Sequence, residues 1–207
     1  MASVRTIKRR LIPVMNSVSR LVEDKHFFQE YQSFMQSNTA IDKQSQFLPF
    51  IGINYIEAAT LGVFREVDRN RRSQSLLNLL REIDANAAQF TYHRFAAKYR
   101  GFMRPMAQRD FQQFTVKDGS RIDRRKLKKD IAKLKRVTRP IVKYRHKYVA
   151  HRNKRPIASP GTINDLYAAI DLLERLVIKY NLLLTQSGMS SLLAGNAYPG
   201  LQGVFKS

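Results

Sequence analysis

Apolar residues recur along this chain at the three- and four-residue spacing of α-helices, whereas the alternation typical of β-strands is almost absent. The spacing predicts long helices over residues 4–35, 50–68, 122–150 and 163–185. A shorter helix is predicted to follow Ser73 or Ser75, since serine is a favoured N-cap residue. The aromatic-rich residues 85–117 are expected to form one or two short helices that either complete the core or cover a cleft. The predicted fold class is all-α, a bundle of four or five main helices.

The second long helix carries two different kinds of apolar residue. Its larger side chains are close to helical phase and are expected to face the core: Ile53, Ile56, Leu61, Phe64 and Val67. Its small residues would let a neighbouring helix approach closely: Gly52, Ala58, Ala59 and Gly62. Near its end, Arg65 and Asp68 lie about one turn apart, so an intrahelical ion pair is expected, with a place in the lining of an active cleft as the alternative.

Breaks in the periodicity divide the chain into three parts. Residues 1–40 form an N-terminal helical arm, residues 46–187 the helical bundle, and residues 188–207 a C-terminal tail that docks on the body or on a second subunit. Pro13 and Pro140 lie inside predicted helices and are expected to bend them.

The composition excludes several kinds of chemistry. The 207 residues include no cysteine, which rules out disulfides, thiol catalysis and cysteine-bound metals. No cluster of His, Asp and Glu has metal-ligand spacing and no glycine-rich phosphate loop is present, so no cofactor is expected. No apolar run reaches the roughly 18 residues of a membrane span, and a secretory signal is missing. We therefore expect a soluble, cytoplasmic protein without a membrane partner.

The net charge of +21 is the strongest bulk signal and indicates a polyanionic partner, with nucleic acid first, an acidic protein second and an anionic membrane third. Residues 121–155 contain 16 Lys and Arg against two Asp, and so contribute +14 of this charge. A solvated helix face is the structural alternative for such a charge run. Its coincidence with an Arg/His cluster favours contact with nucleic acid.

That cluster occupies residues 143–153 and contains Arg145, His146 and His151. Arginine can neutralise a phosphate, and histidine can transfer protons near neutral pH. These two side chains suffice to cleave RNA without a metal ion. The structural alternative for His151 is a helix-terminal histidine that hydrogen bonds free carbonyl groups. His26 and His93 are isolated and are expected to be structural.

The spacing of Arg145 and His151 bears on how such a site could form. On a continuous helix, six residues correspond to about 9 Å of rise and roughly 600° of rotation, which leaves the side chains about 120° apart. The two side chains do not converge on one phosphate unless the helix ends near His151 or a second copy supplies the missing half. This geometry favours a homodimer with a composite site at its interface.

Residues 144–152 read Tyr-Arg-His-Lys-Tyr-Val-Ala-His-Arg, and residues 61–69 carry a helix end with Arg and Asp before a Ser-Leu-x-x-Leu helix. In this order the two segments resemble the HEPN domains of the abortive-infection U-type branch, whose motif often reads Tyr-Arg-Asn-Lys-x-x-Ala-His-Arg. His146 departs from the asparagine that this branch favours. The resemblance spans roughly residues 50–185 and implies a dimeric, metal-independent ribonuclease of a toxin–antitoxin or antiviral defence system.

The residue types then suggest roles. Arg145 would hold the scissile phosphate, His151 would act as general base or acid, and His146 would assist proton transfer or orient the phosphate. The RNA backbone would be drawn in by flanking basic residues: Lys143, Lys147, Arg152, Lys154 and Arg155. Tyr148 and Tyr144 either stack on bases or belong to the core. Two rival functions remain open, namely a non-catalytic nucleic-acid-binding protein and an assembly subunit for an acidic partner such as an antitoxin.

Overall fold

The computed structural model describes residues 3–38, 45–115, 119–146 and 161–193, and its elements are helical. They are listed here in chain order: α1 (Val4–Ser37), α2 (Phe47–Glu66), α3 (Leu76–Ala85), η1 (Ala87–Gln89), α4 (Tyr92–Ala96), η2 (Gly101–Met103), α5 (Arg104–Gln112), α6 (Arg124–Tyr144) and α7 (Ile163–Thr185). Within the described residues, β-type pairing is limited to one isolated bridge between Thr91 and Arg121. The predicted all-α fold is confirmed.

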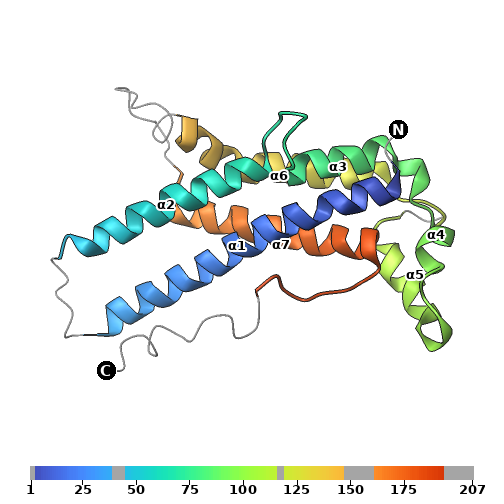
Figure 1. Cartoon of the computed structure of the whole chain (residues 1–207), viewed down its shortest axis with the longest axis horizontal. Helices are drawn as coiled ribbons and strands as arrows, with labels where there is room; N and C mark the ends of the chain where they lie inside the picture. Colours follow the sequence, from blue (N-terminus) through green and yellow to red (C-terminus); the bar gives the residue numbers. More distant parts are fainter. Residues whose placement is uncertain (1–2, 39–44, 116–118, 147–160, 194–207) are drawn as a thin grey trace.

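The four long helices form an elongated bundle, with α7 packed against α1, α2 and α6 (Figure 1). The short helices α4 and α5 lie at one end of the bundle, beside the beginning of α1. The C-terminal end of α6 lies at the other end, next to α2. The short helices α4 and α5 and the C-terminal end of α6 therefore lie at opposite ends of the bundle.

The first helix buries one stripe along its whole length and runs uninterrupted through Pro13. Its predicted core residues are all buried: Leu11, Val14, Val18, Leu21 and Val22. At Gly62 of α2, an added Cβ would lie 2.5 Å from Leu21 Cδ2, so α1 and α2 approach more closely than a larger residue permits. The expected role of small residues in helix contact is confirmed here.

The predicted core face of α2 is wrong at its N-terminal end. Ile53 is 58% exposed, and Phe47 and Phe50 are each 61% exposed. The buried residues of this helix are Ala59, Thr60, Val63 and Glu66, which lie on its small-residue face and toward its end. Because α2 is apolar on nearly all sides, its periodicity could not identify which side the bundle would cover.

By length and apolar content, α2 is also the one helix of the described residues that could cross a membrane. Core helices that pass the same test are mostly buried, whereas only 17% of this stretch of α2 is buried in the structure.

The aromatic residues between 85 and 115 complete the core. Phe95 lies 5.0 Å from Phe111 and Phe114 lies 6.1 Å from Tyr180 of α7, measured between ring centroids. Phe90, Phe95, Phe111 and Phe114 are each no more than 5% exposed. Of the two alternatives for this segment, completion of the core is the one observed.

The last helix has the predicted bounds and well-formed ends. Thr162 Oγ1 accepts a hydrogen bond from the Asp165 N–H at 3.1 Å, while Asp165 Oδ2 accepts one from the Thr162 N–H at 2.8 Å. The helix ends at Gln186, which has a left-handed φ of 59°. Beyond it, the Leu192 N–H donates to Glu174 at 2.8 Å, so the first residues of the predicted tail dock on the body.

Candidate functional site

The end of α6 places Arg145 and His146 against Phe64 of α2. The Arg145 guanidinium lies 4.2 Å from the centroid of the Phe64 ring, and the His146 ring meets the same ring edge-on at 5.5 Å. Arg145 Nη1 is 3.5 Å from His146 Nδ1. A single aromatic ring thus orients both candidate site residues, through a cation–π contact and a T-shaped contact.

The backbone at this point departs from the regular helix that was predicted through residue 150. The α-helix ends at Tyr144, and Arg145 and His146 have the wider geometry of a π-helix. Pro140, one turn earlier, lacks an N–H and its ring crowds the carbonyl of Arg136, which weakens the regular hydrogen-bond ladder.

Arg145 retains unused hydrogen-bonding capacity. Its Nε is buried and has no hydrogen-bond partner among the described residues. Arg145 also takes no part in the ion pairs that these residues form. A buried guanidinium donor without an acceptor is costly, and an anionic ligand would satisfy it.

A cleft of about 640 Å³, called here the α2–α6 cleft, opens beside this pair. It lies between the end of α2, the residues that follow it and the second half of α6. Phe64, Val67 and Val142 form part of its apolar surface. Its cationic residues are Arg69, Lys135, Arg136 and Arg139, and its lining also includes His146 and Asp68.

Positive charge dominates this cleft. Asp68 is the one acidic residue in the described lining, and the four cations form no ion pair with any described residue. Partial burial, followed by the charges of Arg81 and Arg69, lowers the pKa of Lys135. The mutual repulsion of these side chains would be relieved by a polyanion.

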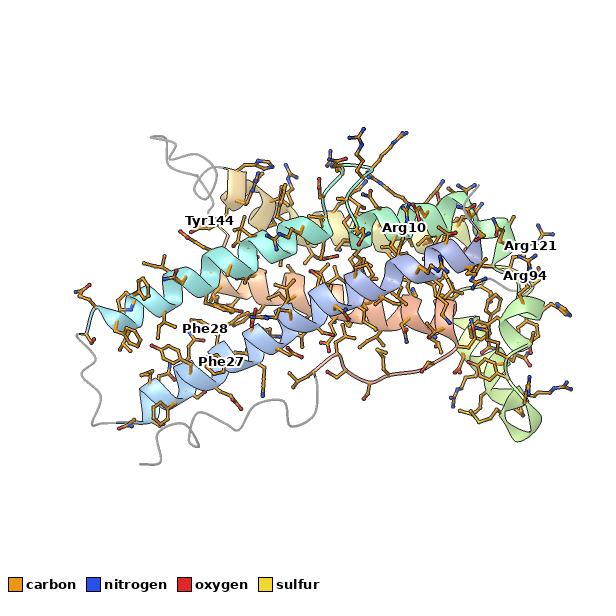
Figure 2. The ribbon with its side chains drawn as sticks, viewed as in Figure 1. Arg10, Phe27, Phe28, Arg94, Arg121 and Tyr144 are labelled. Atoms are coloured by element: carbon orange, nitrogen blue, oxygen red, sulfur yellow. The ribbon has the colours of Figure 1, made fainter. Side chains whose placement is uncertain are left out.

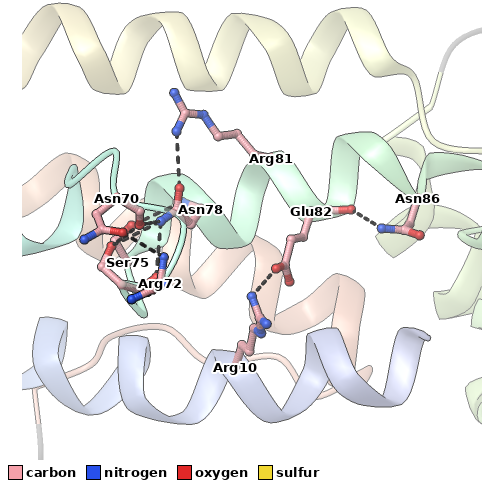
Figure 3. Close-up of polar contacts among 9 residues, drawn as sticks. Arg10, Asn70, Arg72, Ser75, Asn78, Arg81, Glu82 and Asn86 are labelled. Atoms are coloured by element: carbon pink, nitrogen blue, oxygen red, sulfur yellow. Dashed lines mark hydrogen bonds and ion pairs between the residues drawn. The ribbon is translucent and has the colours of Figure 1, made fainter. Parts of the chain in front are cut away.

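One wall of the cleft begins in a loop of residues 68–75, called here the arginine loop because it carries Arg69, Arg71 and Arg72. Asn78 of α3 holds this loop: its Nδ2 donates to the carbonyl oxygen of Asn70 at 2.6 Å and to that of Ser73 at 3.2 Å (Figure 3). Asn78 is only 7% exposed. The three arginines are exposed, so the loop is fixed at its base and presents its charges to solvent.

The arginine loop is anchored at both of its ends. Ser75 Oγ donates to the carbonyl of Asp68 at 3.0 Å and accepts from the Asn78 N–H at 3.3 Å. Ser75, rather than Ser73, is therefore the N-cap of α3. Asp68 Oδ1 accepts from the Asn70 N–H at 3.0 Å, and Asp68 forms no ion pair with Arg65. The predicted Arg65–Asp68 pair is wrong because α2 ends at Glu66 and the chain turns away.

A buried carboxyl group lies beneath this loop. Glu66 is 2% exposed, and its Oε2 accepts a hydrogen bond from the Leu76 N–H at the start of α3, at 3.0 Å. Burial raises the pKa of Glu66 to about 7, although hydrogen bonds from the Ser17 hydroxyl and the Leu76 N–H oppose the shift. Glu66 thus joins the end of α2 to the start of α3 and stabilises the base of the cleft.

The structure brings together only part of the predicted site. Arg145 and His146 lie side by side, His146 lines the cleft, and Lys143 is exposed nearby on α6. The remaining predicted residues lie outside the described residues: Lys147, Tyr148, His151, Arg152, Lys154 and Arg155. The predicted relation between Arg145 and His151 therefore stays a prediction.

Sequence reasoning missed several residues of the cleft. Lys135, Arg136 and Arg139 belong to the basic run, but nothing in their spacing assigned them to a common site with Arg69. Phe64 was predicted to be a core residue, and no local signal marked it as the ring beneath Arg145. Among the residues that the structure describes, no group of three or more His, Cys, Asp or Glu is positioned to hold a metal ion.

An all-α bundle whose basic helix ends in an Arg-His pair beside a cationic cleft has the organisation of a HEPN domain. The family model HEPN_AbiU2, described as AbiU2, matches residues 23–198. This match covers most of the chain, and the protein belongs to that family, as the resemblance in its sequence indicated. No curated protein and no solved structure matches it.

Proposed function

We propose that this protein is a metal-independent endoribonuclease of a defence or toxin–antitoxin system. The observation that carries the proposal is the position of the Arg145–His146 pair on Phe64: Arg145 stacks on this ring, while His146 and Phe64 both line a cleft rich in cations. An RNA backbone in this cleft would meet fixed positive charge on two walls. Its phosphates would supply the acceptor that Arg145 lacks.

The proposed chemistry uses Arg145 and His151. As general base, His151 would take the proton of a ribose 2′-hydroxyl, whose oxygen then attacks the adjacent phosphorus. The bond from phosphorus to the 5′-oxygen breaks, and the leaving oxygen takes a proton from a protonated histidine, for which His146 is the candidate within the described residues. The products are a 2′,3′-cyclic phosphate and a 5′-hydroxyl. DNA, which lacks the attacking hydroxyl, would not be cleaved.

Arg145 would stabilise the charge that develops on the phosphate oxygens. In a homodimer, a second copy of the chain would supply its own His151 to complete the site. This is the composite arrangement that the helix geometry favours. The exposed Phe47, Phe50 and Ile53 provide an apolar surface of the kind that subunits bury on association.

One experiment tests this proposal directly. The purified protein is incubated with labelled RNA in excess EDTA, beside Arg145→Ala and His151→Ala variants and an Arg9→Ala control, which removes an exposed cation of α1 outside the α2–α6 cleft. We expect EDTA-resistant cleavage with cyclic phosphate ends, lost in the first two variants and retained in the control. Equal cleavage by all four proteins would refute the assignment. A strict monomer in light scattering would refute the composite site.

A second candidate function rests on the cleft alone. The cations of the α2–α6 cleft would bind a nucleic-acid backbone even if no catalysis occurred. Salt-sensitive RNA binding without cleavage would favour this non-catalytic role. A protein with no affinity for RNA at low salt would instead favour the assembly role with an acidic partner such as an antitoxin.

A further inference from the structure

The arginine loop continues beyond the α2–α6 cleft. Of its three arginines, Arg69 lines the cleft, whereas Arg71 and Arg72 are exposed farther along the loop. The loop projects from the bundle between α2 and α3 (Figure 1). None of the three arginines forms an ion pair with a described residue. Two cations outside the cleft are therefore open to an anion that extends past it.

The backbone of the arginine loop is held in a tight turn. The Ser73 N–H donates to the Asn70 carbonyl at 2.9 Å, so Arg71 and Arg72 occupy the two central positions of a β-turn. The Arg72 N–H also donates to Asn70 Oδ1 at 3.0 Å, a contact that asparagine commonly forms in turns. Asn78 holds the same turn from α3. Little backbone entropy is therefore lost when an anion binds the two arginines.

Arg81 extends the positive surface from the loop to α6. Its Nη1 donates to Asn78 Oδ1 at 3.2 Å, and its side chain extends from α3 toward α6 (Figure 3). Burial, followed by the charges of Arg81 and Arg69, lowers the pKa of Lys135 on α6, so these three cations lie close together. The positive surface thus joins the base of the arginine loop to the α6 wall of the cleft.

This positive surface is longer than one nucleotide. Lys135 and His146 are eleven residues apart and both line the cleft, which corresponds to about 16 Å along the helix. Phe64 contacts Arg145 at one end of the cleft, while the charge of Arg69 acts on Lys135 at the other. The arginine loop therefore lies at the end of the cleft away from Arg145. A strand must span several nucleotides to contact both places.

We propose that the arginine loop is a distal contact site for the RNA strand, so that efficient cleavage requires about four or more nucleotides on one side of the scissile phosphate. This role of the loop rests on the proposed function, which places that phosphate at Arg145. From there the strand would follow Arg139 and Lys135 along α6, and its next phosphates would reach Arg71 and Arg72. Backbone contacts of this kind carry no sequence information. The loop would therefore select substrates by the length of their single strand and not by their bases.

The test uses DNA oligonucleotides that carry one ribonucleotide, because cleavage is then confined to a single position. One series is extended on the 5′ side of the ribonucleotide and the other on the 3′ side, by about one to eight nucleotides. We expect kcat/KM of the full chain to rise with length in one series. Arg71→Gln/Arg72→Gln should lower the ratio of long-substrate to short-substrate kcat/KM in that series by about 3- to 30-fold, since exposed cations each contribute modestly.

Arg100→Gln/Arg104→Gln is the matched control, because it also removes two exposed charges. These residues follow α4 and begin α5, at the end of the molecule that Figure 2 marks with Arg94, whereas Tyr144 marks the end of α6. The control should change the kcat/KM ratio less than about twofold. An equal fall in both double variants, or an unchanged ratio in Arg71→Gln/Arg72→Gln, would overturn the proposal.

A binding assay separates the distal site from the proposed nuclease activity. The same strands with deoxyribose at every position cannot be cleaved, and fluorescence anisotropy measures their affinity. If the wild type cleaves no substrate, the nuclease proposal fails and the affinities decide the role of the loop. Weaker binding of long strands relative to short ones in Arg71→Gln/Arg72→Gln, and not in the control, supports the distal site. Wild-type affinities for both lengths would refute it. Both arginines are exposed, so thermal unfolding should show that the variant is folded.

Discussion

The buried carboxyl group of Glu66 makes a quantitative prediction about how stability depends on pH. Burial raises its pKa from the ordinary 4.5 to about 7. In the unfolded chain the group ionises near its ordinary value, so between roughly pH 4.5 and 7 the folded state holds a proton that the unfolded state releases. The stabilising contribution of the protonated group is therefore complete below about pH 4.5 and is lost as the pH rises through 7.

The size of the effect follows from the shift. A difference of about 2.5 pH units corresponds to about 3 kcal/mol, at 1.36 kcal/mol per unit. Glu66→Gln keeps an acceptor for the Leu76 N–H and cannot ionise. Relative to the wild type, the free energy of unfolding of this variant should rise by about 2.5 kcal/mol between pH 5 and pH 8, because most of the wild-type loss falls in this range.

Urea unfolding of the two proteins at several pH values between 5 and 8 measures this difference directly. Subtracting the free energy of unfolding of the wild type from that of the variant at each pH cancels the contributions of the titratable groups that both proteins contain. If the difference in free energy of unfolding between the two proteins stayed constant from pH 5 to 8, the raised pKa of Glu66 would be refuted. A Glu57→Gln variant, altered at an exposed carboxylate of the same helix, is the control and should show no such trend.

Three further predictions concern the α2–α6 cleft. Phe64→Leu removes the ring beneath Arg145, worth about 0.5–2 kcal/mol, and should slow RNA cleavage about 2- to 30-fold in a single-turnover assay; an unchanged rate would show that the ring does not position the arginine. Asn78→Ala removes the donor that holds the carbonyl groups of Asn70 and Ser73, so urea unfolding should reveal a loss of about 0.5–1.5 kcal/mol; an unchanged free energy of unfolding would contradict this role. Arg136→Gln/Arg139→Gln should reduce the slope of log affinity against log salt for single-stranded RNA by about 1.4, or 0.7 for each phosphate contact; an identical slope would remove these arginines from the interface.

The helical elements were predictable because their signals are local. Thr162 and Asp165 form the capping box of α7, and the apolar stripe of α1 follows one helical phase throughout. Such features depend on residues three or four positions apart, which the linear sequence places together. The Arg-His cluster at the end of the basic helix was visible for the same reason.

The burial of α2 could not be predicted in this way. Large apolar residues occur on nearly every side of this helix, so its periodicity does not select a face. The close contact of Gly62 with Leu21 fixes which side of α2 faces α1. These two residues are far apart in the sequence. Ile53 is exposed as a result, and the end of α2 is turned toward α6.

By itself, then, the sequence determined the all-α fold, the family and the position of the basic helix with its Arg-His pair. Only the tertiary structure placed Phe64 beneath Arg145 and brought Arg69 into one cleft with Arg136 and Arg139. Local patterns specify helices and their caps, because these form within a few residues. Clefts form where distant helices meet, and their chemistry depends on packing that no single segment encodes.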